Sequence, residues 1–554
     1  MLRRRLARLA PRRRLSRFPF AILVAIALCA GPGVGVASAI TSRVVIDPTG
    51  EHTGDEFGRS IAWVGDANGD GYDDVLVGAF RYPEIASVGQ AYLYLGGPTM
   101  DAVADLVITP PSGGTGWFGV SVASAGDFNG DGHADFIIGA QQAGAEGRAF
   151  IYYGGPALDG TPDVTLIGET TGAITAFGAS VAAAGDMNED GFGDVIVGAP
   201  WYPGGNNKPG RAYLYFGGAA PDALADRVFT GVGFFDQLGS AVGSAGDMNG
   251  DGHPDLFASA PNNTAAALGA GVISVWFGGP GSDATADLNL PGFGVNERLL
   301  NAANAGDVND DGFSDLIGAG KDHVSVWFGG STPNAVADLT LARTYASVAC
   351  AGDVDGDGID DFVVGAQYDA SGGSGRASIY FGGSGVDTVD DLHYDGVPGG
   401  GAIGLSVAGG GHVDGPGPAD VIASAFFDPE AIGYNMGHVF VMANSGACDG
   451  SAPLPGAVNG SVRLAGDGSG ATITWSDAPG PFNVYRGSRT SGSPWNYNQT
   501  CHDSHVAASN TTDSENPLLG TVFFYLVTRV GACGESIPGQ DSGGQSNPNP
   551  APCP

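Results

Sequence analysis

A nonapeptide that recurs along the chain constrains the fold more than any other feature of the sequence. In the copy Asp127-Phe-Asn-Gly-Asp-Gly-His-Ala-Asp135, oxygen-bearing side chains stand at positions 1, 3, 5 and 9, and glycine stands at position 6. A hard divalent cation such as Ca²⁺ requires several oxygens on a tight loop, with a turn residue that tolerates φ > 0. The next residues, Phe136–Ala140, form a β-rich apolar run. We therefore expect the loop on a β-hairpin and not between helices.

The chain contains six copies of this nonapeptide. Position 6 is glycine and position 9 is aspartate in every copy, and position 3 is Asn in five copies and Asp in the sixth. Solvated Asx turns are the alternative, but they would let these positions drift among Asn, Ser, Gly and Asp. We therefore predict about six Ca²⁺ ions, one in each loop. The predicted ligands are Asp66, Asn68, Asp70, Asp74, Asp127, Asn129, Asp131, Asp135, Asp186, Asn188, Asp190, Asp194, Asp247, Asn249, Asp251, Asp255, Asp307, Asn309, Asp311, Asp315, Asp353, Asp355, Asp357 and Asp361.

The spacing of the copies indicates a repeat protein. Successive copies begin 61, 59, 61, 60 and 46 residues apart, which is the range of propeller and solenoid repeats. A strand of small residues such as Ser121–Gly126 precedes each loop, and an apolar strand follows it. An aromatic strand ending in Gly-Gly, such as Arg211–Gly218, and a fourth strand such as Ala104–Ile108 complete the unit. Four antiparallel strands per unit, repeated radially, predict the blades of an all-β propeller.

A seventh unit is altered. Its loop runs from His412 to Asp420, with His at position 1 and Pro416 at position 5, so two carboxylates are missing and we predict no calcium there. The segment Arg43–Asp47 resembles a fourth strand that lacks a blade of its own. We expect it to complete the seventh blade and close the ring, which removes the open sheet edges.

The repeated phrases resemble FG-GAP repeats. The resemblance rests on the pairs Phe57-Gly58, Phe118-Gly119 and Phe177-Gly178 and on phrases such as Gly198-Ala-Pro200. It implies the seven-bladed propeller found at the head of integrin α subunits, with calcium in the hairpins between strands 1 and 2 and a ligand-binding role. Units five and six depart from the pattern, with Arg298-Leu299 and Thr344-Tyr345 in place of Phe-Gly. No integrin leg domain follows, so heterodimer assembly and signalling are not expected.

Four segments are predicted. Residues 1–39 are interpreted as a signal peptide, because an Arg-rich stretch precedes a short apolar run and a small-x-small cleavage site. Residues 40–446 form the propeller. Residues 447–538 resemble a small fibronectin type III-like β-sandwich, with strand-like runs and a Trp expected to be buried. Residues 539–554 form a Pro/Gly/Ser-rich tail.

The cysteines agree with export. Cys448, Cys501, Cys533 and Cys553 lie near the C-terminus, where an oxidising compartment would pair them into two disulfides. Four cysteines allow three connectivities, and the sequence does not choose among them. Cys350 lies within the propeller region and is expected to be a free buried thiol.

Net charge narrows the class of partner. The formal charge is −36 at pH 7, and removing the eight Arg of the first 39 residues leaves 15 basic and 59 acidic side chains, or −44. This excess argues against nucleic acid and anionic membranes as partners. No later segment has the features of a transmembrane helix. We expect a monomer that is secreted or held at the cell surface.

Function is expected to be binding and not catalysis. The His residues are scattered over loops, and neither a zinc-protease motif, a nucleophile elbow nor a phosphate-binding Gly loop with Lys is present. We expect calcium to act structurally, while an extracellular protein or glycan binds on the opposite face, where the loops joining strands 2–3 and 4–1 emerge. The candidate ligand-contacting aromatics are Tyr82, Trp117, Trp201, Tyr202, Phe235, Tyr368 and Phe427. The alternatives are a structural cell-surface protein without a specific ligand, and an extracellular hydrolase of polysaccharide or phospholipid.

Overall fold

The computed structural model describes most of the propeller region and the strands of the C-terminal region. In the propeller region it covers residues 42–46, 48–51, 54–82, 87–98, 100–111, 116–205, 207–279, 281–368, 374–396, 402–425 and 437–444. In the C-terminal region it covers 463–466, 471–474, 482–490, 500–506, 510–513, 521–531 and 534–535. The predicted signal peptide, the tail and Phe427 lie outside these ranges. Within them every regular element is a strand, and no helix long and apolar enough to cross a membrane occurs.

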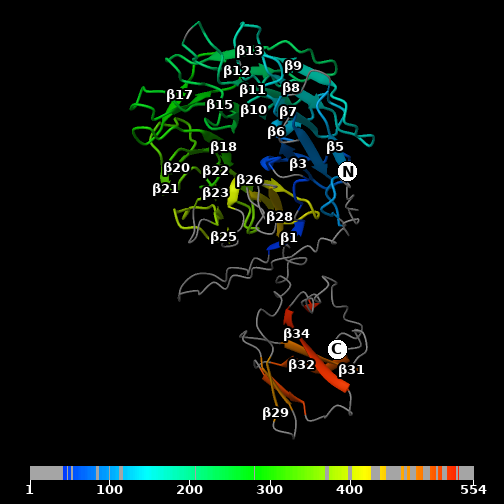
Figure 1. The fold of residues 1–554 in the computed structure, drawn as a ribbon. Helices are drawn as coiled ribbons and strands as arrows, with labels where there is room; N and C mark the ends of the chain where they lie inside the picture. Colours follow the sequence, from blue (N-terminus) through cyan, green and yellow to red (C-terminus); the bar gives the residue numbers. More distant parts are fainter. Residues whose placement is uncertain are drawn as a thin grey trace, which may run out of the picture. The chain divides into compact units, whose positions relative to one another are not determined.

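The unit Ser42–Gly446 is a seven-bladed β-propeller, as predicted (Figure 1). Blade 1 contains β2 (Phe57–Gly65), β3 (Asp74–Ala79), β4 (Gln90–Tyr94) and β5 (Leu106–Ile108). Blade 2 contains β6 (Phe118–Gly126), β7 (Asp135–Ala140), β8 (Arg148–Tyr152) and β9 (Val164–Ile167). Blade 3 contains β10 (Ser180–Gly185), β11 (Asp194–Ala199), β12 (Arg211–Tyr215) and β13 (Arg227–Thr230). Blade 4 contains β14 (Val242–Gly246), β15 (Asp255–Ala260), β16 (Val272–Trp276) and β17 (Leu288–Pro291). Blade 5 contains β18 (Asn301–Gly306), β19 (Asp315–Ala319), β20 (His323–Trp327) and β21 (Leu339–Ala342). Blade 6 contains β22 (Ser347–Gly352), β23 (Asp361–Ala366), β24 (Arg376–Tyr380) and β25 (Leu392–Asp395). Blade 7 contains β26 (Ile403–Gly411), β27 (Asp420–Ala425), β28 (His438–Asn444) and β1 (Ser42–Ile46).

The N-terminal strand closes the ring, which confirms the prediction made from its sequence. Each blade is an antiparallel sheet whose strands follow chain order, except that β1 supplies the outermost strand of blade 7. The register pairs Arg43 with Ala443 and Val44 with Met442, and a bulge follows before Ile46 pairs with Val441. The first and last strands of the propeller therefore share one sheet, and its closure depends on both ends.

The hydrophobic core lies between neighbouring blades, because both faces of strands 2 and 3 pack against adjacent sheets. Every residue of β3, β7 and β11 is buried, and each strand is apolar after the aspartate that begins it. Between blades 1 and 2, Leu93 and Ile108 pack with Phe118, Phe136 and Phe150. Similar clusters join blades 2 to 6 in sequence and blade 7 to blade 1. These blades are therefore stabilised largely by packing against their neighbours.

The Phe-Gly pair of one blade meets the Gly-Ala pair that ends strand 2 of the preceding blade. A Cβ added to Gly78 would lie 2.1 Å from the carbonyl oxygen of Gly119 in the next blade, and one added to Gly139 would lie equally close to Gly178. The neighbouring Phe118 and Phe177 are fully buried in the clusters between blades. Glycine is needed here because the two backbones approach closely, and the phenylalanine fills the space beside them.

The C-terminal unit is described as strands only. β29 (Arg463–Gly466), β30 (Ala471–Thr474) and β33 (Asn510–Asp513) form one sheet. β32 (Thr500–Val506), β31 (Phe482–Thr490), β34 (Thr521–Gly531) and β35 (Gly534–Glu535) form another. Two antiparallel sheets are compatible with the fibronectin type III-like sandwich, which stays a prediction. The side chains of the four C-terminal cysteines lie outside the described residues.

Cys350, on the innermost strand β22, has a free thiol as expected. Burial raises the pKa of this thiol to about 12.

Candidate metal centres

All six intact nonapeptides form the hairpin between the first and second strands of a blade. Position 9 is the first residue of the second strand in each case, as in Asp74 of β3 and Asp361 of β23. Glycine at position 6 has φ between +88° and +91° in all six loops, and a Cβ added there would meet nothing within 4 Å. Position 6 is therefore glycine because of its backbone conformation and not because of crowding.

The side chain at position 1 organises each loop. Its Oδ1 accepts a hydrogen bond from the amide of position 5 at 2.9–3.1 Å. Its Oδ2 accepts one from the amide of position 6 at 2.7–3.0 Å. In the first five loops the Asn at position 3 donates from Nδ2 to Oδ2 of position 5. The predicted ligands of each loop are therefore brought together around one turn.

Position 9 has a second role that the sequence did not reveal. Its carboxylate is fully buried. Its Oδ2 accepts a hydrogen bond from the amide of position 2, and its Oδ1 accepts one from the first glycine of the Gly-Gly pair that follows strand 3. In blade 1 these donors are Ala67 N at 3.0 Å and Gly96 N at 2.8 Å from Asp74. Position 9 thus fixes the loop to the blade through two backbone hydrogen bonds that need no metal.

Burial makes this carboxylate difficult to ionise. It raises the pKa of Asp74, Asp194, Asp315 and Asp361 to about 7, and that of Asp135 and Asp255 to about 6. The amide hydrogen bonds lower the pKa, and neighbouring aspartates of the same loop raise it. A divalent cation would supply the positive charge that these clustered carboxylates lack, because an opposite charge favours the ionised form. The residues present therefore fit a calcium site.

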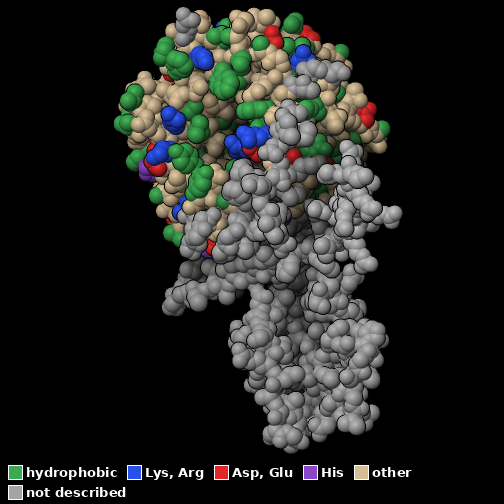
Figure 2. Space-filling view, viewed as in Figure 1, with side chains coloured by type: hydrophobic (Ala, Val, Ile, Leu, Met, Phe, Trp, Pro, Cys, Tyr) green, Lys and Arg blue, Asp and Glu red, His purple; other side chains and the backbone are tan. Residues whose placement is uncertain are grey.

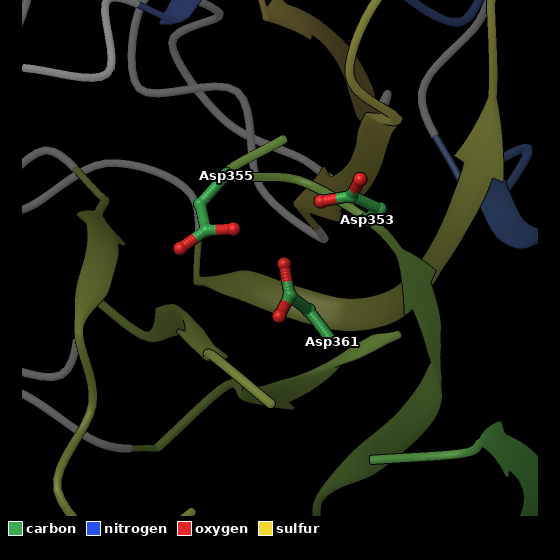
Figure 3. A group of neighbouring side chains, drawn as sticks. All are labelled: Asp353, Asp355 and Asp361. Atoms are coloured by element: carbon green, nitrogen blue, oxygen red, sulfur yellow. The ribbon is translucent and has the colours of Figure 1, made fainter. Parts of the chain in front are cut away.

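The sixth loop gathers the largest number of carboxylates. The side chains of Asp353, Asp355 and Asp361 converge (Figure 3), and one oxygen from each lies within 4.8 Å of the other two. Burial and the neighbouring Asp357 raise the pKa of Asp355. Because position 3 is a carboxylate here and an amide in the other five loops, we expect this loop to bind Ca²⁺ most tightly.

Two substitutions at position 9 separate its structural role from its metal-binding role. Asp361 accepts amide hydrogen bonds from Val354 and Gly382, both at 2.8 Å, and Asp420 of the altered loop accepts one from Val413 at 2.8 Å. We expect Asp361→Ala and Asp420→Ala each to lower the free energy of unfolding by about 2–3 kcal/mol in EGTA, because buried amides lose their acceptor. Only Asp361→Ala should also lower the number of bound Ca²⁺ ions. Urea unfolding with and without Ca²⁺ measures the first effect, and an unaltered stability of Asp420→Ala would contradict the structural role.

The loops are joined to one another around the ring. At most of the junctions the amide of position 8 donates to the carbonyl of position 1 in the preceding loop, as from Ala134 to Asp66 at 3.2 Å. The fourth loop is an exception, because Pro254 stands at position 8 and has no amide hydrogen to donate. The altered seventh loop continues the series, since Asp73 N donates to His412 O at 3.2 Å and Asp73 Oδ2 accepts from His412 N at 2.8 Å. Pro416 at position 5 has no amide hydrogen to donate to position 1. The seventh loop therefore keeps the contacts between blades but lacks the hydrogen bonding of a metal loop.

The face opposite the aspartate loops carries most of the basic residues of the propeller. Of the eleven Lys and Arg residues in the propeller unit, nine lie near the strand ends away from the aspartate loops: Arg59, Arg81, Arg148, Lys208, Arg211, Arg298, Lys321, Arg343 and Arg376. Figure 2 shows Lys and Arg side chains that stand among hydrophobic and acidic ones. Several of these basic residues are paired with acids, as Arg81 is with Glu56 at 3.0 Å and Arg376 is with Asp395 at 2.6 Å. The fold thus separates the acidic loops from most of the basic residues.

The candidate aromatics that the structure describes lie on this face, over several blades. Tyr368 is 64% exposed and Phe235 is 39% exposed, whereas Tyr82, Trp117, Trp201 and Tyr202 are half-buried. Trp117 packs against Phe80, with ring centroids 5.1 Å apart, and the Arg211 guanidinium lies 3.7 Å from the ring centroid of Tyr202.

Sequence reasoning missed three further exposed aromatics on this face. They are Phe234 and Phe293, each 65% exposed, and Tyr345, which is 45% exposed. The ring centroid of Tyr345 lies 6.3 Å from that of Tyr368. Phe234 and Phe293 each follow a glycine in a loop that joins one blade to the next. An aromatic residue after a glycine in such a loop was the sequence feature that could have predicted their exposure.

Comparison with known proteins agrees with this architecture. The FG-GAP repeat family model matches residues 57–94, 118–152, 177–215, 238–276 and 345–380, which correspond to blades 1, 2, 3, 4 and 6. Blade 6 is matched although Thr344-Tyr345 replaces Phe-Gly there.

Curated relatives include integrin α chains. Integrin alpha-5 of Xenopus laevis is 33% identical over 177 residues, covering 30% of this chain and 17% of that protein. Integrin alpha-8 of Mus musculus is 39% identical over 181 residues, covering 30% and 16%. Phosphatidylinositol-glycan-specific phospholipase D of Bos taurus is 32% identical over 171 residues, covering 28% and 20%. The matched region thus spans a fifth or less of each of these relatives. Five blades thus match the FG-GAP repeat model, and the seven-bladed propeller is similar to part of the integrin α chains.

Proposed function

We propose that the chain is an exported protein that holds about six Ca²⁺ ions in its aspartate loops and binds an extracellular protein or glycan on the opposite face. The segregation of the two faces carries this proposal. One face holds the acidic hairpins, and the other holds nine basic residues and the exposed aromatics. The resemblance to integrin α chains, which implies calcium in the hairpins and a ligand-binding role, also supports the proposal. Export rests on the predicted signal peptide.

The exposed aromatics are the best candidates for contact with a ligand. Phe235 lies beside Lys208, whose Nζ is 5.9 Å from the ring centroid, and beside Phe234, at 4.4 Å between centroids. Tyr368 and Tyr345 form a second exposed pair. Aromatic rings next to cations suit sugars, through stacking, and acidic or aromatic side chains of a protein partner. The half-buried Tyr202 is a weaker candidate because it is engaged by Arg211.

Glycan and protein arrays, probed in Ca²⁺, test this proposal. The variant Phe235→Ala/Tyr368→Ala should lose at least tenfold in affinity for any ligand found, because exposed aromatic anchors supply much of the binding energy in interfaces. The matched control is Leu224→Ala/Val336→Ala, which removes similarly exposed apolar side chains, 73% and 71% exposed, near the aspartate loops. Its binding should equal that of the wild type. Loss of binding in the control with none in the aromatic variant would show that the faces have been assigned the wrong way round.

A hydrolase is the second candidate, favoured only by the similarity to phosphatidylinositol-glycan-specific phospholipase D. That similarity covers a fifth of the relative, and the described residues provide no catalytic constellation that we recognise. Release of a lipid-anchored or polysaccharide substrate by the purified protein would favour this alternative over binding.

A further inference from the structure

A pocket of about 400 Å³ lies on the side of the aspartate loops, where blade 1 meets blade 2. Leu93, Leu95 and Leu106 of blade 1 form one apolar wall, and Leu158 of blade 2 forms part of the other. These four leucines also belong to the apolar cluster between the two blades. The volume falls within the range of small-molecule sites, whose walls are mainly apolar.

Leu95 distinguishes this junction from the others. It precedes the Gly-Gly pair after strand 3, and the next five blades have an aromatic residue at that position: Tyr153, Phe216, Phe277, Phe328 and Phe381. The first four of these rings pack against the cluster between their own blade and the next, as Leu95 does in blade 1. An aromatic ring reaches farther from the backbone than a leucine side chain. We infer that the shorter side chain of Leu95 leaves this space open at the junction of blades 1 and 2.

The polar rim of the pocket is acidic and accepts hydrogen bonds. It comprises Asn68 and Asp70 of the first loop and Asp105, an exposed residue whose Oδ2 accepts a hydrogen bond from Leu95 N at 2.9 Å. The Asn68 amide group donates to Asp70 Oδ2 at 2.9 Å. One Ca²⁺ in the first loop would offset two of its three carboxylate charges, and Asp105 adds another negative charge. The rim therefore stays negative with calcium bound.

We propose that this pocket binds a small organic amine, with an apolar stem against the leucines and a protonated primary amine at Asp105, which lies outside the calcium loop. An ammonium group has three donors and no acceptor, which matches a rim of oxygen acceptors. The excess negative charge of the chain would also raise the local concentration of cations. This site is separate from the ligand face proposed above, so either can fail without the other.

The test compares two probes of equal length, n-hexylamine and 1-hexanol, on the Ca²⁺-saturated protein by saturation-transfer and chemical-shift NMR. Hexylamine should bind saturably and at least tenfold more tightly than hexanol. Asp105→Asn keeps an oxygen acceptor but removes the charge, so it should weaken hexylamine binding at least fivefold and leave hexanol binding unchanged. Equal affinity for the two probes, or an unchanged affinity in Asp105→Asn, would overturn the proposal.

The repeat supplies a matched pair of variants for the pocket itself. Leu95→Phe introduces the residue type of the other blades and should weaken hexylamine binding at least tenfold without altering the calcium count. Phe328→Leu should open a second pocket between blades 5 and 6, where Asn309, Asp311 and Asp338 repeat the rim. Hexylamine binding should return when Phe328→Leu is added to Leu95→Phe. Wild-type affinity in a folded Leu95→Phe variant would contradict the assigned location.

Discussion

Chelating calcium with EGTA is expected to lower the melting temperature of the protein by roughly 10 °C. A ligand that binds only the folded state stabilises it by mass action, which amounts to about 2 kcal/mol per site when free Ca²⁺ exceeds Kd about thirtyfold. Six such sites would together contribute on the order of 10 kcal/mol. The buried position 9 carboxylates add a physical reason, since without a cation they face other carboxylates in a poorly solvated place.

Differential scanning calorimetry in Ca²⁺ and in EGTA measures this effect. Adding Ca²⁺ back in excess over EGTA should restore the original melting temperature, which separates metal loss from damage by the chelator. Mg²⁺ at the same concentration should restore less, because it demands a small octahedral site and gives up its water reluctantly. Identical melting curves in Ca²⁺ and EGTA would contradict a structural role for the ion.

Removing the N-terminal strand is the second change for which we expect a large effect. A chain that begins after Ile46 lacks β1, so β28 becomes an unpaired edge beside β27 and β26. We expect the free energy of unfolding to fall by roughly 4 kcal/mol or more, in the range of the largest single changes. Exposed strand edges also promote pairing between molecules, so aggregation should increase.

The control for this truncation is a chain that begins at Ile40, which keeps β1 and lacks only the predicted signal peptide. It should melt like the untruncated protein and stay monomeric. Urea unfolding and size-exclusion chromatography compare the two chains. If the chain without β1 matched the control in both measurements, closure of the ring by β1 would not contribute to stability.

Much of the propeller was predictable because it is repeated. A sequence motif that recurs seven times occupies the same backbone environment each time. The hairpin loop, the four strands and even the isolated strand Ser42–Ile46 could therefore be assigned from the repeated sequence pattern. Interpreting the uniform aspartate at position 9 as a metal ligand alone was incomplete. Asp420 remains in a loop that has lost two other carboxylates, because it still accepts the amide of Val413.

Features that occur only once could not be predicted from the repeat pattern. Trp63 stands on an innermost strand where the corresponding residues are small, such as Ser124 and Ala183. Its ring packs against Gly411 of blade 7, where an added Cβ would lie 2.2 Å from the indole. This contact joins the first and last blades, which lie far apart in the sequence. The exposure of Phe234 and Phe293 likewise depends on how loops of successive blades are placed.

The number of bound calcium ions tests the central claim most directly. Equilibrium dialysis against saturating Ca²⁺, followed by elemental analysis, should find about six ions per chain. Replacing positions 1 and 5 of one loop, as in Asp127→Ala/Asp131→Ala, should lower the count by one. A count of three or fewer in the folded wild-type protein would contradict the assignment of one ion to each aspartate loop.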